Sequence, residues 1–386
     1  GDYEIRLSSP LEINRKAIVD GGEHRIVING DSDLDGVGDT QLFKLYSGAN
    51  ATLQNLTLTN GLGVDGGAIQ NGGTLTVKDS TFTANRAEGT DAGSGGAIHN
   101  TGYLTVTGST FSANSAWGRG GAMYSDQGSL TLTNNTFSGN SVDWEYGWGG
   151  AVASFSSATI NNNTFVGNQA VIGGAVSSSY YPQDIYNNIL VKGSTGENCY
   201  YWQTTPIIAG SNLADDDSCG TGFTNLSTLS TGMNALGSYG GPTQTFQLLP
   251  GSPAIDAADS SQCPATDQRG VTRPQGTACD VGAYEFQETT IPSDYVISGV
   301  VYDDLNGNGS RDAGELGIEN APVYILLNID QTPFSSLTAE TSADGSFQFT
   351  LTPPDGGLPA GFSVSVYVEP LSPAVEITQL HAPFAA

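Results

Sequence analysis

The twelve residues "DLNGNGSRDAGE", 304–315, space their oxygen-bearing side chains as a calcium-binding loop does. They match the pattern D-x-[DN]-x-[DN]-G-x5-E in full, and Gly309 stands at the position of the sharp turn. The predicted ligands are the side chains of Asp304, Asn306, Asn308, Asp312 and Glu315, with the main-chain carbonyl of Ser310. An acidic, solvated turn is the alternative, but we expect Ca²⁺ because every ligand position is filled.

A second acidic loop, "DSDLDGVGDTQL", covers residues 31–42. Its carboxylates belong to Asp31, Asp33, Asp35 and Asp39, which surround Gly36. The twelfth position holds Leu42, so the bidentate acid of a complete loop is absent. Because clustered carboxylates repel each other without a cation, the loop also predicts Ca²⁺, with a metal-free solvated loop as an open alternative.

The chain has 4 cysteines, which form two local pairs in sequence, Cys199 with Cys219 and Cys263 with Cys279. Four cysteines allow three connectivities, and loop proximity favours the local one. Zinc binding is disfavoured because the cysteines are spread out and lack a CxxC spacing. Disulfides at these positions predict an oxidising, extracellular location.

These candidate sites lie around a repeat. The segment "GGAIQNGGTLTVKDSTFTANRA" from Gly66 returns as "GGAIHNTGYLTVTGSTFSANSA" from Gly95, and further copies begin at Gly120, Gly149 and Gly173. A period of this length is typical of solenoids, in which stacked copies bury one continuous core. Short alternating runs such as "TLTV" indicate strands, and no stretch has the apolar spacing of a helix.

Alignment of the copies places apolar residues in columns. One column holds Ile69, Ile98, Met123, Val152 and Val176, another holds Val77, Val106, Leu132 and Ile160, and a third holds Phe82, Phe111, Phe137 and Phe165, with Leu58 before it. Asn85, Asn114, Asn140 and Asn168 recur three residues after each Phe. We expect about three inward-facing strands per copy and a ladder of hydrogen-bonded asparagines. The fold class predicted is all-β, a right-handed parallel β-helix.

The loops that precede each GGA triplet vary in length and carry aromatic residues. Trp117 lies in one such loop, and Trp144, Tyr146 and Trp148 lie in the next. Since insertions emerge on one side of a solenoid, we expect these rings to be neighbours that stack on sugar rings or form a subunit contact. The alternative is that the loops fold their aromatics back onto the side of the helix.

The sequence does not predict an enzyme. No GxSxG, HExxH or phosphate-loop motif is present, and His99 stands at a variable, outward position of the repeat. The aspartates of the repeats fall at different repeat positions and predict no acidic cluster: Asp65, Asp79, Asp91, Asp126 and Asp143. The rival class is a carbohydrate-active enzyme, a polysaccharide lyase or glycoside hydrolase, which needs a pair of carboxylates or a cationic base in one groove.

The net charge of the chain limits the classes of partner that it can bind. The 386 residues include 12 basic and 39 acidic ones, which gives a net charge of −27. Such a surface repels nucleic acid and anionic membranes and attracts divalent cations. The chain begins at Gly1 and contains no transmembrane run, so we interpret it as a mature exported fragment that does not insert into a membrane.

The repeat, with "GGAI" followed by "FxxN", resembles that of chlamydial polymorphic outer-membrane proteins. The wider stretch is similar to the choice-of-anchor Q surface proteins of bacteria, whose tail pattern appears as "GGPTQTFQLLPGSPAIDAAD" (240–259) and "CPATDQRGVTRPQGTACDVGAYE" (263–285). The resemblance covers about three quarters of the chain. It implies an exported surface protein and leaves the ligand and any reaction open.

After a short linker, "FQETTIPSD", the pattern changes to alternating strands separated by Gly and Pro turns. This segment predicts a small Ig-like β-sandwich and resembles the SdrD B-like and Cna B-type modules, which act as stalks or spacers. It contains no Lys, which excludes the Lys–Asn isopeptide bond of some such modules. The expected domains are therefore a β-helix over 1–290, with a disulfide-stapled cap at about 199–285, and a sandwich over 291–386.

Together these observations predict an extracellular bacterial surface or matrix protein with a structural or adhesive role. The N-terminal stretch "GDYEIRLSSPLEI" alternates like a strand and has no capping helix before it. Unpaired strand edges add to other strands, so we also expect self-association, end to end or by strand exchange, into an oligomer or filament. A glycan or other cell-surface ligand is the second expected partner.

Overall fold

The computed structural model describes residues 3–89, 93–204, 206–287, 295–308, 310–329, 332–351, 362–368 and 375–380. The chain divides into two compact units, Gly1–Glu288 and Thr289–Ala386.

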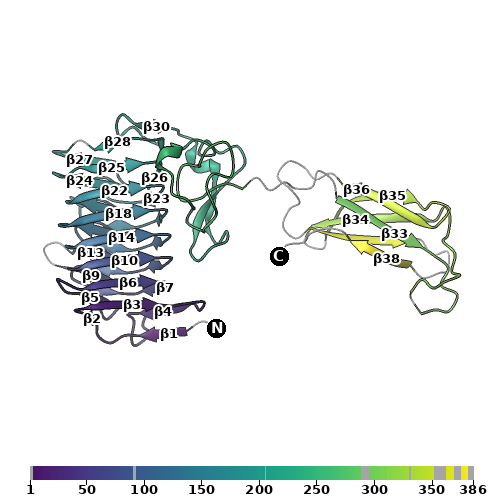
Figure 1. The fold of residues 1–386 in the computed structure, drawn as a ribbon, viewed down its shortest axis with the longest axis horizontal. Coiled ribbons are helices and arrows are strands. Elements are labelled where there is room, and N and C mark those ends of the chain that lie inside the picture. The colour runs from purple at the N-terminus through teal and green to yellow at the C-terminus, as the bar shows by residue number, and fades with distance from the viewer. Residues whose placement is uncertain are drawn as a thin grey trace. The chain divides into compact units, whose positions relative to one another are not determined.

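The first unit is a right-handed parallel β-helix, in which the chain winds around one core and each turn adds a strand to the same sheets (Figure 1). Strands of successive turns pair in parallel and in register, so Phe82 pairs with Phe111 and Thr81 with Thr110. Over the described residues, the chain builds three long sheets, A, B and C, and a fourth, D, of two-residue strands. The sequence predicted about three strands per repeat. The structure adds to these the two-residue strand of sheet D.

Sheet A contains β1 (Tyr3–Arg6), β4 (Ile26–Asn29), β7 (Leu56–Thr59), β11 (Thr81–Thr83), β15 (Thr110–Ser112), β19 (Thr136–Ser138), β23 (Thr164–Asn168), β26 (Ile189–Lys192), β29 (Asn212–Ala214) and β30 (Phe223–Asn225). Sheet B contains β2 (Leu11–Ile13), β5 (Phe43–Leu45), β9 (Ile69–Asn71), β13 (Ile98–Asn100), β17 (Met123–Ser125), β21 (Val152–Ser154), β24 (Val176–Ser179) and β27 (Cys199–Trp202). Sheet C contains β3 (Lys16–Asp20), β6 (Asn50–Gln54), β10 (Thr74–Lys78), β14 (Tyr103–Thr107), β18 (Ser129–Thr133), β22 (Ser157–Asn161), β25 (Gln183–Tyr186) and β28 (Ile207–Ile208). Sheet D contains β8 (Leu62–Gly63), β12 (Arg86–Ala87), β16 (Ser115–Ala116) and β20 (Ser141–Val142).

The predicted columns of apolar residues are confirmed as the core. Ile69 pairs with Ile98 in sheet B, and Val77 pairs with Val106 in sheet C. In sheet A the rings of Phe82, Phe111, Phe137 and Phe165 stack in one fully buried column, with centroids 4.5, 5.1 and 4.7 Å apart. Leu58 continues this column below Phe82. Each phenyl ring therefore has a stacking partner on at least one neighbouring turn, which adds to the free energy of its burial.

The GGA triplets form the sharp corner that leads into sheet B. Gly95 has φ +70°, a left-handed conformation that favours glycine, and a Cβ on Gly96 would lie 2.0 Å from the carbonyl oxygen of Gly121. The backbones of neighbouring turns thus approach too closely for a side chain at Gly96. Ala97, the next residue, is fully buried and packs in the core of the β-helix.

The predicted asparagine ladder is confirmed. Asn85 donates from Nδ2 to Oδ1 of Asn114 at 2.9 Å, Asn114 donates to Asn140 at 2.9 Å, and Asn140 donates to Asn168 at 2.8 Å. Each Nδ2 also donates to a main-chain carbonyl of the preceding turn, as Asn114 does to Phe82 at 3.0 Å. Buried amides at the corner between sheets A and D are therefore satisfied, which avoids the cost of an unpaired polar group.

A second ladder, not predicted, runs along the corner between sheets C and A. Asn135 donates to Asn163 at 3.0 Å, Asn163 to Asn188 at 3.1 Å, and Asn188 to Asn212 at 3.1 Å. Its earlier turns carry Ser80 and Ser109 instead, which hid the column in the sequence.

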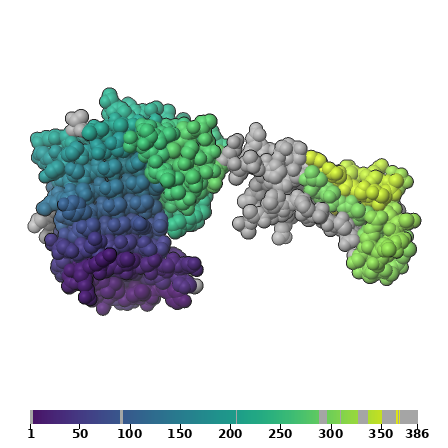
Figure 2. Space-filling view, in the orientation of Figure 1, coloured from purple at the N-terminus to yellow at the C-terminus, as the bar shows by residue number. Residues whose placement is uncertain are grey.

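Residues 199–286 do more than cap the end of the helix. β27 to β30 continue its turns, and the chain then folds back along the outer face of sheet A through η1 (Leu229–Gly232), the antiparallel pair β31 (Met233–Gly237) and β32 (Thr245–Leu248), and η2 (Ser260–Gln262). Thr136 Oγ1 donates to Gln268 at 2.6 Å, and the amide of Ala283 donates to Thr164 Oγ1 at 3.0 Å. Figure 2 shows this segment, in green, against the side of the β-helix.

The cysteines are joined as Cys199–Cys219 and Cys263–Cys279, the local pairing. Near the second bridge, Arg273 forms an ion pair with Glu285 at 3.0 Å, and both side chains are completely buried. Arg273 also donates to the carbonyl oxygen of Gly282 at 2.7 Å. The tail motif 263–285 therefore has a structural explanation, because its charged residues form a buried polar network.

The second unit is a small β-sandwich of two antiparallel sheets. One sheet has the order β36 (Ser346–Leu351), β33 (Tyr295–Val301), β38 (Val375–Leu380), and the other has the order β35 (Thr332–Glu340), β34 (Pro322–Ile329), β37 (Phe362–Val368). Its core contains Ile297, Val301, Val323, Ile325 and Phe347. Alternation along each strand directs these residues inward, as expected for a sandwich.

Candidate functional site

The loop 304–315 brings part of its predicted ligand set together, around Asp312. Its three carboxylates, those of Asp304, Asp312 and Glu315, do not form a group within 4.8 Å among the described residues. The side chains of Asn306 and Asn308 both donate to Oδ2 of Asp312, each at 2.7 Å. Glu315, only 6 % exposed, closes the loop by accepting from the amides of Leu305 at 3.0 Å and Asp312 at 2.8 Å. Gly309 lies outside the described residues. The side chains of this loop are carboxylates and amides. Rotation of the Asn306 and Asn308 amide groups by about 180° would turn their oxygens toward Asp312, and such a set of oxygen ligands fits Ca²⁺.

In the loop 31–42, carboxylate oxygens of Asp31, Asp33 and Asp39 lie within 4.8 Å of one another. Asp31 is buried, and its two oxygens accept from the amides of Leu34 at 2.7 Å and Gly36 at 3.0 Å. Asp35, predicted as a fourth ligand, is not part of this group; its carboxylate accepts from the amide of Val37 at 2.8 Å instead.

The environment of this acidic loop accounts for its incomplete ligand pattern. Leu42 is fully buried in the core of the β-helix, so the twelfth position cannot present a carboxylate to the loop. Hydrogen bonds from the hydroxyl and amide of Ser32 lower the pKa of Asp39. Three converging carboxylates suit an oxygen-coordinated cation, with fewer ligands than the complete loop offers.

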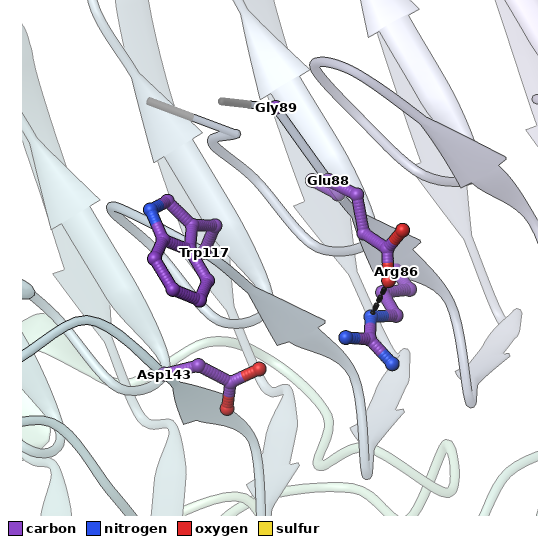
Figure 3. Close-up of a pocket in the computed structure, with 6 residues that line it drawn as sticks. Arg86, Glu88, Gly89, Trp117 and Asp143 are labelled. Atoms are coloured by element: carbon purple, nitrogen blue, oxygen red, sulfur yellow. Dashed lines mark ion pairs between the residues drawn. The ribbon is translucent and has the colours of Figure 1, made fainter. Parts of the chain in front are cut away.

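A groove of about 580 Å³ lies beside sheet D (Figure 3). Glu88, Trp117 and Asp143 occupy the same repeat position on three successive turns, because the amide of Trp117 donates to Ala87 and that of Asp143 donates to Ala116, each at 3.0 Å. Trp117 is 45 % exposed. Arg86 forms an ion pair with Glu88 at the edge of the groove. The result is an open indole face with a carboxylate on the turn before it and another on the turn after it.

Two of the other predicted aromatics accompany Trp117. The amide of Trp144 donates to the carbonyl oxygen of Trp117 at 3.0 Å, and the Trp144 ring meets Tyr146 edge to face at 5.6 Å. Both side chains are exposed.

Trp148 departs from the prediction. It lies on the outer face of sheet B, where its ring packs edge to face against Phe155 at 5.4 Å and Tyr200 at 5.2 Å. The reason is its place at the GGA corner, where Trp148 pairs with Arg119 of the preceding turn. The expected cluster of four aromatics is thus divided between two surfaces.

The outer face of sheet B brings together polar residues that stand at different positions of the repeat. His99 lies 3.8 Å from Asp65 and stacks on Tyr124 at 5.2 Å between centroids. The Tyr124 hydroxyl donates to Asp126 at 2.9 Å. Asp65 and Asp126 therefore flank one histidine, although they stand at different repeat positions.

Burial governs the titration of this cluster. Desolvation lowers the pKa of His99, and the charges of Asp65 and Asp126 oppose that shift. Burial is also the main reason that the pKa of Tyr124 is raised. His99 points outward from its strand, as predicted, yet its side chain is only 11 % exposed because neighbouring turns cover it. The sequence does contain a signal for this cluster. Side chains alternate between the two faces of a strand, so outward-facing residues at the same register position on neighbouring turns lie next to each other.

Residues 31–213 match the family model described as the right-handed beta helix region. No curated protein matches the chain. In the part of the chain that the structure describes, no helix is long and apolar enough to cross a membrane.

Proposed function

We propose that this chain belongs to an extracellular adhesive surface or matrix protein whose β-helix binds glycans at the Trp117 groove without turning them over. The β-helix fold, its two disulfide bonds and its exposed aromatic groove support this proposal. A β-helix suits this role because it presents one extended surface on a scaffold in which every turn braces the next.

The observation that carries the proposal is the exposed indole of Trp117 between Glu88 and Asp143. The apolar face of a sugar ring stacks on an indole, and carboxylates accept hydrogen bonds from the ring hydroxyls. Main-chain hydrogen bonds beside sheet D fix the backbone positions of these three residues, so binding orders their side chains only.

Charge defines the class of glycan. The chain has a net charge of −27, and Arg86, the cation at the groove, is already paired with Glu88. An anionic polyuronate would be repelled by this surface. We therefore propose neutral glycans as ligands.

A glycosidase is the rival function. Turns of a β-helix are about 4.8 Å apart, so the carboxylates of Glu88 and Asp143, two turns apart, are separated by roughly 10 Å, near the range used by inverting glycosidases. A general acid also needs a buried environment that keeps it protonated. Both residues are exposed, which favours binding over hydrolysis.

Calcium is the proposed cofactor, held mainly by the loop 304–315 and by Asp31, Asp33 and Asp39 in the β-helix. Bound Ca²⁺ would neutralise the converging carboxylates of Asp31, Asp33 and Asp39 and the acidic ligands of the loop 304–315, and so stabilise the folded state by mass action. The role proposed for it is structural.

Self-association is proposed at the N-terminal end of the β-helix. The first turn exposes apolar side chains: Tyr3 by 55 %, Ile5 by 49 %, Leu11 by 42 % and Ile18 by 66 %. β1, β2 and β3 are the end strands of sheets A, B and C in the described chain, and each pairs on one side only. A second copy of the chain could cover this apolar end and add strands to its open edges. Sizing of the protein with and without residues 1–9 tests this, and a monomer at high concentration in both cases contradicts it.

Native electrophoresis in gels that contain a soluble neutral β-glucan, xylan or galactomannan tests the glycan proposal. At least one of these polymers should retard the wild-type protein, Trp117→Ala should run free, and Tyr103→Ala, an exposed tyrosine on sheet C, should remain retarded. A gel with polygalacturonate should retard neither. Release of reducing ends from the same polymers, lost in Glu88→Gln or Asp143→Asn, would instead establish the rival enzyme.

A further inference from the structure

A second groove, of about 600 Å³, lies where sheet B turns into sheet C. Its walls come from three successive turns: Asp126 from the first, Phe155 and Ser157 from the second, and Tyr180 and Tyr181 from the third. On the next turn Trp202, 42 % exposed, pairs with Ser179 at the end of sheet B. Its ring stacks on Tyr200 with centroids 6.4 Å apart and lies 6.4 Å from Trp148, so it belongs to the aromatic surface beside this groove. This surface is separate from the Trp117 groove, which lies beside sheet D.

Two tyrosines at the turn between sheets B and C, Tyr180 and Tyr181, expose their side chains to solvent. Tyr180 is 63 % and Tyr181 49 % exposed. Tyr180 has φ +68°, a left-handed conformation that is strained for a bulky residue and that persists only where surrounding contacts enforce it. A shorter polar residue would fill such a turn at lower cost, so the aromatic rings at this corner require another explanation.

Buried hydrogen bonds hold this turn in place. The Tyr180 amide donates to the carbonyl oxygen of Trp202 at 3.1 Å. Gln183, fully buried, donates from Nε2 to the carbonyl oxygens of Ser156 at 2.9 Å and Tyr181 at 3.2 Å. The backbone that carries the aromatic wall is therefore fixed before any ligand arrives, which reduces the entropy lost on binding.

The opposite wall supplies a positioned carboxylate. Asp126 accepts from the hydroxyl of Tyr124, a ring that is only 6 % exposed, through Oδ1 at 2.9 Å. The guanidinium of Arg119 lies over the faces of both rings, 5.8 Å from the Tyr124 centroid and 5.1 Å from the Phe155 centroid. Oδ2 of Asp126 accepts no hydrogen bond from the described residues, so it can accept from a ligand hydroxyl.

We propose that this groove is a second glycan-binding site, which takes a linear, neutral polysaccharide along the axis of the β-helix. The inference rests on the proposed function and extends it, because it names a further subsite and the form of the ligand. Phe155, Tyr181 and Trp202 come from three successive turns. Neighbouring turns lie about 4.8 Å apart, which is close to the length of one sugar unit in an extended chain.

The chemistry of the lining favours a neutral chain. Aromatic faces stack on pyranose rings, and Asp126 with Ser157 offers acceptors and a donor for hydroxyl groups. Asp126 is the one charged side chain among the lining residues, so an anionic chain would meet repulsion from its carboxylate. Two sites on one rigid scaffold would also strengthen binding of a long polymer beyond that of a short oligosaccharide.

Titration calorimetry of the full chain tests the site with soluble β-glucan, xylan and galactomannan and with hexasaccharides of each. The variants are Tyr181→Ala and Asp126→Asn for this groove, Trp117→Ala for the first groove, and Tyr103→Ala as the exposed control. Tyr181→Ala should weaken binding of the polymer by about tenfold or more, as loss of a central aromatic contact does, while Tyr181→Phe, which keeps the ring, should retain it. Equal melting temperatures would show that the variants are folded.

Each outcome decides between the two sites. Weaker binding by Tyr181→Ala, with Trp117→Ala weakened independently, supports both grooves. If only Trp117→Ala loses affinity, the second groove is wrong and the proposed function stands; if only Tyr181→Ala loses affinity, the second groove stands and the Trp117 site is wrong. Wild-type affinity in all variants, binding of a peptide in place of glycan, or no binding of any polymer contradicts the second site.

Discussion

Phe111 stacks on Phe137 of the next turn, with ring centroids 5.1 Å apart and planes inclined by 13°. The relationship continues down to Phe82 at 4.5 Å, so Phe111 has a ring above and a ring below it. One repeat position thus contacts its counterparts on both neighbouring turns, which couples the stability of one turn to that of the next.

Replacement of Phe111 by Ala should therefore lower the free energy of unfolding by about 3–5 kcal/mol, the cost of a large cavity in a core. Phe111→Leu, which imitates Leu58 in the same column, should cost less. Denaturant unfolding measures both changes. A Phe111→Ala variant with the wild-type midpoint would show that this column does not carry the core.

Asn114 should matter through hydrogen bonding. It donates to Asn140 and to the Phe82 carbonyl, and it accepts from the side chain of Asn85. Asn114→Ala leaves buried partners unsatisfied on both neighbouring turns, at a cost of about 2–4 kcal/mol. Asn50→Ala, at an exposed position on sheet C, is the control and should be nearly neutral. Equal destabilisation of the two variants would contradict a role for the ladder.

His99 should make the β-helix sensitive to acid. Its folded pKa is lowered by burial, so below the unfolded value of about 6.5 the unfolded chain binds the proton more readily than the folded one. The contribution of His99 to the free energy of unfolding is therefore greatest at higher pH and is lost as the pH falls from about 7 towards 5.

Asp280 acts in the opposite direction, since burial raises its pKa to about 6 and the folded state gains a proton there more readily than the unfolded chain. The comparison of wild type with His99→Gln separates the two, because Gln70 already occupies this column one turn away. Denaturant midpoints at pH 7.5 and pH 5 should fall further in the wild type than in the variant. An equal fall in both would contradict the burial of a neutral His99.

Calcium should stabilise the loop 304–315. Thermal melts should show a higher midpoint in excess Ca²⁺ than in EDTA for the transition of the second unit, and Glu315→Gln should shrink the difference. Asp344→Asn, an exposed carboxylate elsewhere in the same unit, should leave the difference unchanged. Identical melts with and without EDTA would contradict calcium binding there.

Much of the β-helix follows from residue spacing. A column such as Ile69, Ile98 and Met123 specifies strand register, because only one alignment of turns buries all of its members. The second asparagine ladder escaped prediction because Ser80 and Ser109 replace Asn in its first turns. A serine hydroxyl can accept the same main-chain amide hydrogen bond as an asparagine side chain. The hydrogen-bonding pattern therefore continues where the residue type changes, and a comparison of residue types alone misses it.

Contacts between unlike repeat positions could not be predicted in the same way. Asp65 meets His99 across one turn because the chain doubles back at the GGA corner. Trp148 faces sheet B for the same reason, since its loop ends at that corner. The packing of residues 233–286 against sheet A depends on a long chain reversal, which local periodicity does not encode.

The central claim is that Trp117 is a sugar-binding platform, and the most direct measurement is titration of the intact protein with soluble neutral polysaccharide. The account predicts saturable binding that Trp117→Ala weakens by about tenfold or more and that Trp117→Phe largely preserves, because a phenyl ring still offers a face for stacking. The same dissociation constant for wild type and Trp117→Ala would contradict it.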